Sequence, residues 1–263
     1  MSKQRRLTTK EKRRQQRENN GTLNSKFSMR QIRPITQTQE DMFYEYRSGK
    51  NIAAIGTAGT GKTMCALYLA LQDVLSDEGY DQIVIIRSAV QTREQGFMPG
   101  TQAQKEAVYA IPYADITRDL FGRGDAWEIL IQKRQIKFMT SSFVRGLTFD
   151  NSIIVVDECQ SMTYHELDSI ITRVGESSKI IFCGDTRQDD LAGSRNRNDV
   201  SGLVSFINVI KSIPSFELVQ FGVEDIVRSG LVKEYIIAKD KQEKQQKPMS
   251  KITHNFGLSS AMA

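Results

Sequence analysis

The stretch from Ile52 to Leu71, IAAIGTAGTGKTMCALYLAL, decides the fold of this chain. A short apolar run leads into Gly56, and after four intervening residues the chain reads Gly61-Lys62-Thr63. The apolar residues that follow recur at the spacing of one helix face. The pattern G-x-x-x-x-G-K-[S/T] between a strand and a helix is typical of a P-loop, which binds the phosphates of a nucleotide.

The chemistry of this loop predicts a nucleoside-triphosphate site. Its glycines allow successive backbone N–H groups to turn inward on an anion. The start of the following helix adds its dipole to the same pocket. We expect Lys62 to reach the β- and γ-phosphates and the Thr63 hydroxyl to ligate Mg²⁺. The residues expected to contact ATP here are Gly56, Thr57, Ala58, Gly59, Thr60, Gly61, Lys62, Thr63 and Met64.

Size and composition limit the alternatives. With 263 residues, the chain could form one large α/β domain or two small ones. It has no apolar run long enough for a membrane span and no signal peptide at its start, so we expect a cytoplasmic protein without membrane association. Cys65, Cys159 and Cys183 are expected to be buried thiols in a reducing compartment.

Charge is concentrated at the N-terminus. Residues 1–33 hold eleven Lys or Arg against Glu11 and Glu18, a balance of +9, whereas the whole chain carries +5. Such a basic, apolar-poor segment is expected to be a disordered arm. Two interpretations remain open for it: a solvated tail, or an electrostatic tether to nucleic acid.

Strands and helices alternate through the rest of the chain. This alternation predicts a mainly parallel sheet with helices on both faces. We expect one α/β domain at residues 34–238, an insertion at the sheet edge at 91–125, a last helix at 224–237 and a polar tail at 239–263. The expected strands are residues 51–56, 82–87, 135–139, 152–157, 179–184 and 216–220.

A second motif supports the nucleotide site. The buried strand Ser152 to Asp157 ends in two carboxylates, Asp157 and Glu158. Downstream of a P-loop, we expect Asp157 to hold Mg²⁺ through water and Glu158 to orient or deprotonate the attacking water.

Other polar residues stand near the expected site with weaker signals. Gln39, ahead of the P-loop strand, could bond an adenine edge, although a surface glutamine would look the same. Gln188, just past the strand at 179–184, could sense the γ-phosphate, although a polar turn would look the same. Arg87 ends the expected strand at 82–87 and Arg145 follows the one at 135–139, at the edge where open α/β sheets bind ligands. An arginine at such a place can also simply pair with a nearby carboxylate.

Several longer stretches resemble the PhoH family of P-loop ATPases over about residues 34 to 237. They are IIRSAVQTREQGFMPG, SSFVRGLTFDNSIIVVDECQ, ITRVGESSKIIFCGDTRQDDL, SGL and VEDIVRSGLV, in that order. The resemblance implies a RecA-like core akin to the first motor domain of superfamily 1 helicases. A phage-encoded member would fit the short chain and its diverged residues.

The resemblance also implies roles for individual residues. Gln39 matches the adenine-side glutamine, and Gly184-Asp185 with Gln188 matches the phosphate-sensing block. For Arg87 and Arg145, the likeness suggests contact with a nucleic-acid backbone. For Arg173 and Arg228, it suggests the γ-phosphate, in cis or as an arginine finger from a neighbouring subunit. Without the family, a Glu224–Arg228 pair within the last helix would explain Arg228. Arg173 follows apolar residues at helical spacing, so a structural role would explain it as well.

Two classes of function follow from this sequence. In the first, hydrolysis of ATP with Mg²⁺ is coupled to binding or remodelling of single-stranded RNA or DNA. In the second, the chain is a nucleotide-gated regulatory module that acts on protein partners. Only one motor domain is encoded, so we expect a homo-oligomer with ATP at subunit interfaces, such as a hexameric ring.

Overall fold

The computed structural model describes residues 27–76, 79–88, 102–185 and 202–246. Within them lies one six-stranded sheet with the strand order β3-β2-β4-β5-β1-β6, in which every neighbouring pair is parallel. The strands are β1 (Asn51–Gly56), β2 (Gln82–Arg87), β3 (Ile136–Thr140), β4 (Ser152–Asp157), β5 (Lys179–Gly184) and β6 (Phe216–Phe221). The six predicted strands are confirmed, each to within one residue at either end.

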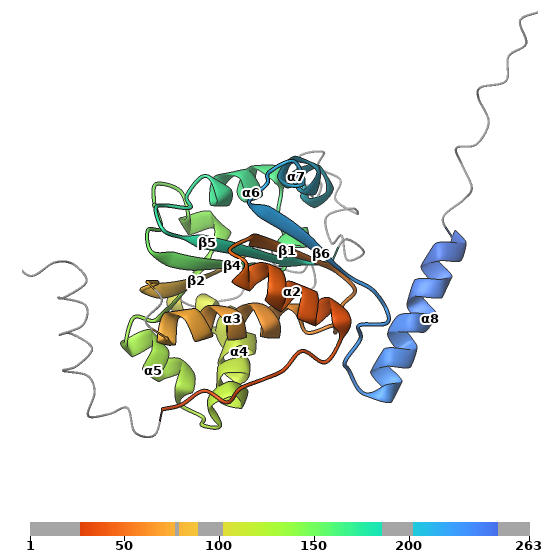
Figure 1. The fold of residues 1–263 in the computed structure, drawn as a ribbon, viewed down its shortest axis with the longest axis horizontal. Helices are drawn as coiled ribbons and strands as arrows, with labels where there is room; N and C mark the ends of the chain where they lie inside the picture. The colour runs from red at the N-terminus through yellow and green to blue at the C-terminus, as the bar shows by residue number, and fades with distance from the viewer. Residues whose placement is uncertain (1–26, 77–78, 89–101, 186–201, 247–263) are drawn as a thin grey trace, which may run out of the picture.

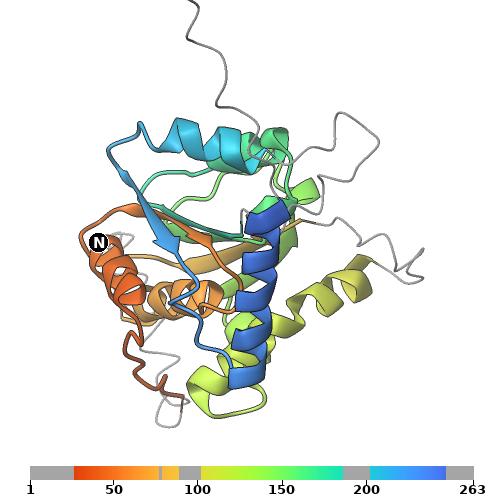
Figure 2. The same ribbon diagram turned by 90° about the vertical axis from the view of Figure 1, so that its right-hand side faces the viewer.

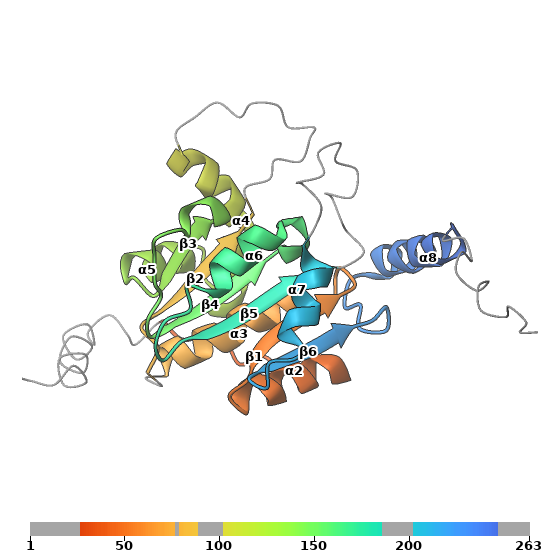
Figure 3. The ribbon, with the colours of Figure 1, turned by 90° about the horizontal axis from the view of Figure 1, so that it is seen from above.

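Helices cover both faces of this sheet (Figures 1 and 3). On one face lie α2 (Gln37–Arg47), α3 (Lys62–Leu75), α4 (Gln102–Phe121) and α5 (Ala126–Gln132). On the other lie α6 (Tyr164–Ile171) and α7 (Leu203–Ile210). Two short 3₁₀ turns, η2 (Ser141–Phe143) and η3 (Cys159–Ser161), follow β3 and β4 directly, and α8 (Gly230–Gln246) follows β6.

Alternating side chains of the strands divide the core in two. In β4, Ile153 and Val155 pack in the cluster below α3, while Ile154 and Val156 pack with α6 and α7. The inner strands are apolar at successive positions because both of their faces are covered. This explains why β4 is buried along its whole length, from Ser152 to Asp157.

The topology places a binding edge at the carboxyl ends of the strands. The helix after β1 lies on one face of the sheet, whereas the helices after β4 and β5 lie on the other (Figure 3). In open α/β sheets, ligands bind where the crossovers diverge in this way. The P-loop after β1 and the acidic end of β4 both lie at this edge, with β5 between them.

The folded body begins before residue 34. Phe27 stacks on Phe121 at 4.4 Å between ring centroids, and the Arg30 N–H donates to the Leu120 carbonyl at 2.9 Å. Part of the segment predicted as a free arm therefore contacts α4, because it carries apolar residues, Phe27 among them, that the arm's charge concealed.

The last helix differs from its prediction. It begins at Gly230 rather than 224 and runs through residue 246, into the segment predicted as a tail. Leu231 is 78% exposed, and α8 stands apart from the helical layers in Figure 1 and faces the viewer in Figure 2. The Gly222 N–H donates to the Asp225 carboxylate at 2.8 Å, so the chain turns before the helix begins.

Candidate functional site

The P-loop adopts the backbone that its glycines permit. Gly56, Gly59 and Gly61 all have positive φ angles, of 139°, 74° and 83°. A Cβ on Gly56 would lie 2.0 Å from the Phe221 carbonyl oxygen of β6, so no side chain fits there. Because the backbone of β6 approaches so closely, only glycine can occupy position 56 without a clash.

Lys62 begins α3 and points back into the loop. Its ammonium donates to the Gly56 and Thr57 carbonyls at 2.9 and 2.7 Å. Burial lowers the pKa of Lys62, and the carboxylate of Asp185 is the first of several charges that oppose this shift. The lysine is thus a buried cation at the mouth of the loop, where a phosphate would be its natural partner.

Asp157 ends β4 and joins two elements of the site. Its Oδ1 accepts a hydrogen bond from the Thr63 hydroxyl at 2.9 Å, and its Oδ2 accepts one from the Tyr113 hydroxyl at 2.9 Å. Burial and then the charge of Glu158 raise the pKa of Asp157, whereas these two bonds lower it. The predicted pair of metal-binding residues, Thr63 and Asp157, is therefore in direct contact.

Glu158 lies in a left-handed conformation, with φ of 52°. Such a backbone is uncommon for a residue with a side chain, and it recurs at functional sites. The Gln160 amide donates to the Glu158 carboxylate, and the Gln160 oxygen accepts from the Asp185 N–H at 3.0 Å. Gln160 is 2% exposed, so it ties the carboxylate of Glu158 to the end of β5.

Gln39 is 3% exposed and braces the P-loop from α2. Its amide donates to the Thr60 carbonyl at 2.9 Å, and its oxygen accepts from the Ile35 N–H at 2.9 Å. A Cβ on Gly61 would lie 3.0 Å from the same amide nitrogen. The glutamine predicted to touch adenine is thus bonded to the backbone of the P-loop.

Arg228 lies over the tip of the P-loop of its own chain. A Cβ on Gly59 would lie 2.8 Å from Arg228 Cγ, and the Val227 N–H donates to the Gly59 carbonyl at 3.1 Å. The alternative of a Glu224–Arg228 pair within a helix is wrong, because both residues precede the start of α8. Arg228 therefore lies against the P-loop of its own chain.

Arg87 and Arg145 flank the site at the same edge of the sheet. Arg87 is the register partner of both Asp157 and Thr140, and its guanidinium lies 6.0 Å from the ring centroid of Tyr109. Arg145 is exposed and follows η2.

Arg173 and Gln188 do not join this group. Arg173 follows α6 and its carbonyl accepts from the Phe149 N–H, which places it at the amino end of β4, opposite the P-loop. Any contact between Arg173 and a γ-phosphate would therefore have to be made to a neighbouring subunit. Gln188 lies outside the described residues.

Tyr113 and Gln160 belong to the site although the sequence did not predict a role for either. Tyr113 sits in a segment interpreted as an insertion at the sheet edge, and its contact with Asp157 spans 44 positions in the chain. Gln160 was noted only as part of a family block. A signal for Gln160 exists, since a polar residue two positions after Glu158 in a 3₁₀ turn can bond back to it.

The residues present fit Mg²⁺ and a nucleoside triphosphate. Hydroxyl and carboxylate oxygens, which Thr63 and Asp157 supply, are the ligands that Mg²⁺ prefers. The cradle of three positive-φ glycines ahead of a helix start suits a polyphosphate. Among the described residues, no helix is long and apolar enough to cross a membrane.

Comparison with known proteins gives relatives along most of the chain. The PhoH-like protein of Bacillus subtilis (strain 168) is 32% identical over 212 residues, which make up 80% of this chain and 65% of that protein. Protein PhoH of Escherichia coli (strain K12) is 32% identical over 182 residues, 68% of this chain and 50% of that protein. The chain thus spans between half and two thirds of the length of these relatives.

Two solved structures are similar in part. The large terminase of a thermophilic bacteriophage, in complex with ADP, has a TM-score of 0.44 at 12% identity, covering 82% of this chain and 51% of the terminase chain. The UvsW helicase of bacteriophage T4 has a TM-score of 0.42 at 17% identity, covering 78% of this chain and 67% of the helicase chain.

The family profile covers most of the folded body. The profile described as PhoH-like protein matches residues 31–240, a range that contains the P-loop, the acidic end of β4 and the start of α8. The parallel sheet, with β5 between the P-loop strand and the acidic strand, is an α/β P-loop core of the RecA-like type. The chain is therefore a member of the PhoH-like protein family.

Proposed function

We propose that this chain hydrolyses ATP with Mg²⁺ and couples turnover to single-stranded RNA or DNA. The observation that carries the first part is the contact of Thr63 with Asp157 beside the buried ammonium of Lys62. A metal-binding pair and a phosphate-binding cation meet at one edge of the sheet, as phosphoryl transfer requires.

In the proposed reaction, the P-loop amides and Lys62 hold the triphosphate. Mg²⁺ bound by Thr63 and Asp157 would neutralise charge that develops on the phosphate oxygens. Glu158, oriented by Gln160, polarises a water for in-line attack on the γ-phosphorus. Arg228 stabilises the negative charge from above the loop, and Gln188 senses the γ-phosphate.

The test of hydrolysis uses Glu158→Gln, which keeps the shape of the side chain and removes its charge. We expect this variant to bind ATP with the affinity of the wild type and to lose at least about 100-fold in turnover. Undiminished turnover would show that Glu158 does not activate the water.

The surface beside the site supports the coupling to nucleic acid. Phe143 is 48% exposed and Tyr164 is 39% exposed. Their elements are joined by a bond from the Ser141 hydroxyl to the Glu166 carboxylate at 2.6 Å. Arg145 lies two residues after Phe143, and Arg87 is the register partner of Thr140, which precedes η2. Exposed aromatic rings close to arginines can stack on the bases of a single strand and track its backbone.

The coupling is tested by measuring ATPase turnover with and without single-stranded RNA and DNA, at low and high salt. Stimulation by either polymer that weakens with salt, and that falls when residues 1–26 are removed, is the expected result. A turnover that responds to neither polymer would favour a nucleotide-gated module that acts on protein partners.

We also propose that the working form is a homo-oligomer, such as a hexameric ring. Leu231 and Tyr235 of α8 are 78% and 67% exposed, although Ile236 on the same helix lies beside the P-loop. Apolar side chains exposed beside a nucleotide site suit a subunit interface. Light scattering with and without a non-hydrolysable ATP analogue tests this, and a monomer with full ATPase turnover would refute it.

A further inference from the structure

The metal-binding carboxylate has a second partner that the proposed reaction does not use. The Tyr113 hydroxyl donates to Asp157 Oδ2 at 2.9 Å, while Thr63 donates to Asp157 Oδ1 on the other side. The terminal torsion of an aspartate is soft, so one bond alone leaves the plane of the carboxylate free to turn. The two bonds together define which oxygen faces Thr63.

The tyrosine is itself held firmly. Tyr113 is fully buried, and its ring packs against Phe138 and Trp127 with centroid distances of 5.7 and 6.5 Å. The hydroxyl of a tyrosine is protonated at neutral pH, so it acts as the donor in its bond to the Asp157 carboxylate. A rigid ring thus presents a fixed donor to a carboxylate that would otherwise be mobile.

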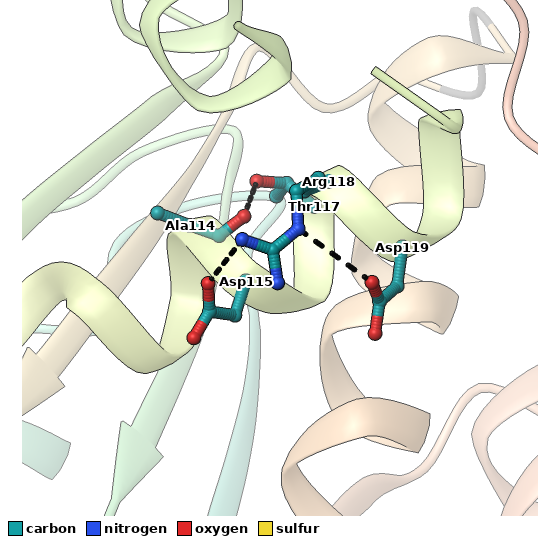
Figure 4. A network of polar contacts seen from close by, with 5 residues as sticks. All are labelled: Ala114, Asp115, Thr117, Arg118 and Asp119. Atoms are coloured by element: carbon teal, nitrogen blue, oxygen red, sulfur yellow. Dashed lines mark hydrogen bonds and ion pairs between the residues drawn. The ribbon is translucent and has the colours of Figure 1, made fainter. Parts of the chain in front are cut away.

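The helix that carries Tyr113, α4, is held in place mainly by its buried apolar residues. Its outer face carries Arg118, which lies 2.8 Å from Asp115 and 3.8 Å from Asp119 (Figure 4). These groups are more than half exposed, and such pairs contribute about 0–1 kcal/mol. Burial of apolar residues, including the Tyr113 ring and Leu120, anchors α4 instead.

We propose that Tyr113 is a positioning residue of the metal site, and that its hydroxyl fixes the orientation in which Asp157 serves Thr63 and Mg²⁺. The inference rests on the proposed role of Asp157 as a metal-binding residue. Groups that orient a metal ligand contribute to metal affinity without touching the metal. The tyrosine comes from α4, so this helix, which the sequence suggested was peripheral, is part of the site.

The test is Tyr113→Phe, which removes one oxygen and keeps the ring. Tyr46→Phe is the matched control, because Tyr46 is also buried and its hydroxyl donates to the Asp73 carboxylate at 2.6 Å. Asp73 lies near the end of α3, away from the P-loop. Both variants therefore lose a tyrosine–aspartate bond, and only one loss is at the site.

The readout is the binding of a fluorescent ATP analogue, measured in EDTA and during titration with Mg²⁺. We expect Tyr113→Phe to weaken the apparent Mg²⁺ affinity about 10-fold to 100-fold. Its nucleotide affinity in EDTA should match the wild type. Tyr46→Phe should change neither quantity.

Three outcomes are distinguishable. Wild-type Mg²⁺ affinity in Tyr113→Phe overturns the positioning role. An equal loss of nucleotide binding in EDTA also overturns it, because the tyrosine would then merely support the fold. If the wild-type protein itself shows no Mg²⁺-dependent binding of the nucleotide, the proposed function fails along with the inference.

Discussion

The strongest structural prediction concerns Gln160, whose side chain has two partners inside the site. Gln160→Leu removes both the bond to the Glu158 carboxylate and the bond that the Gln160 oxygen accepts from the Asp185 N–H. Removing one partner of a buried hydrogen bond costs about 1–3 kcal/mol, and the leucine recovers part of this through its apolar contacts. We therefore expect the free energy of unfolding to fall by about 1–2 kcal/mol.

The same substitution should also lower the rate of ATP turnover. Without the bond from Gln160, the Glu158 carboxylate would no longer be held in the orientation that the proposed reaction requires. We therefore expect turnover to drop about 10-fold to 100-fold while ATP affinity is kept. Urea denaturation and steady-state kinetics measure the two effects. Gln135→Leu is the control, since its amide oxygen is buried without a partner among the described residues. Full turnover in Gln160→Leu would refute the reasoning.

Three further predictions follow from the same contacts. Burial raises the pKa of Asp157, so its ionised form lowers the free energy of unfolding at pH values above that pKa. Asp157→Asn should therefore have a higher melting temperature than the wild type at pH 7 without Mg²⁺. The difference should shrink as the pH falls toward 3.8, the ordinary pKa of the carboxyl. Burial raises the pKa of Cys65 to about 12, and Cys159 and Cys183 are also buried, so all three thiols should resist a thiol reagent at pH 8 until the protein unfolds. Phe143→Ala should weaken binding of a single strand by about 1–3 kcal/mol, whereas Arg145→Ala should reduce its salt slope by about 1, both measured by fluorescence anisotropy.

The sequence predicted the parts of the fold that depend on local patterns. Each strand showed a short apolar run, because covered parallel strands need no polar face. The P-loop and the Asp157–Glu158 pair could also be predicted, because each motif consists of residues close together in the chain. The three cysteines were also predicted correctly as buried thiols.

What the sequence did not reveal depends on contacts across the chain. Tyr113 reaches Asp157 from a helix whose pattern is interrupted by Pro112, so the segment looked peripheral. The start of α8 was predicted too early because the apolar Ile226 packs in a turn rather than on a helix face. Phe27 was hidden in a segment whose composition is dominated by charge.

The central claim is tested most directly by the ATPase rate of Lys62→Ala beside Lys50→Ala. Lys50 immediately precedes β1, the strand that leads into the P-loop, and its ammonium donates to the Pro214 carbonyl. It therefore controls for the loss of a lysine from this region. We expect Lys62→Ala to lose at least about 100-fold in turnover and Lys50→Ala to retain it, because Lys62 lies within the P-loop and Lys50 bonds to the Pro214 carbonyl at the opposite end of β1. Equal turnover in the two variants would contradict the account.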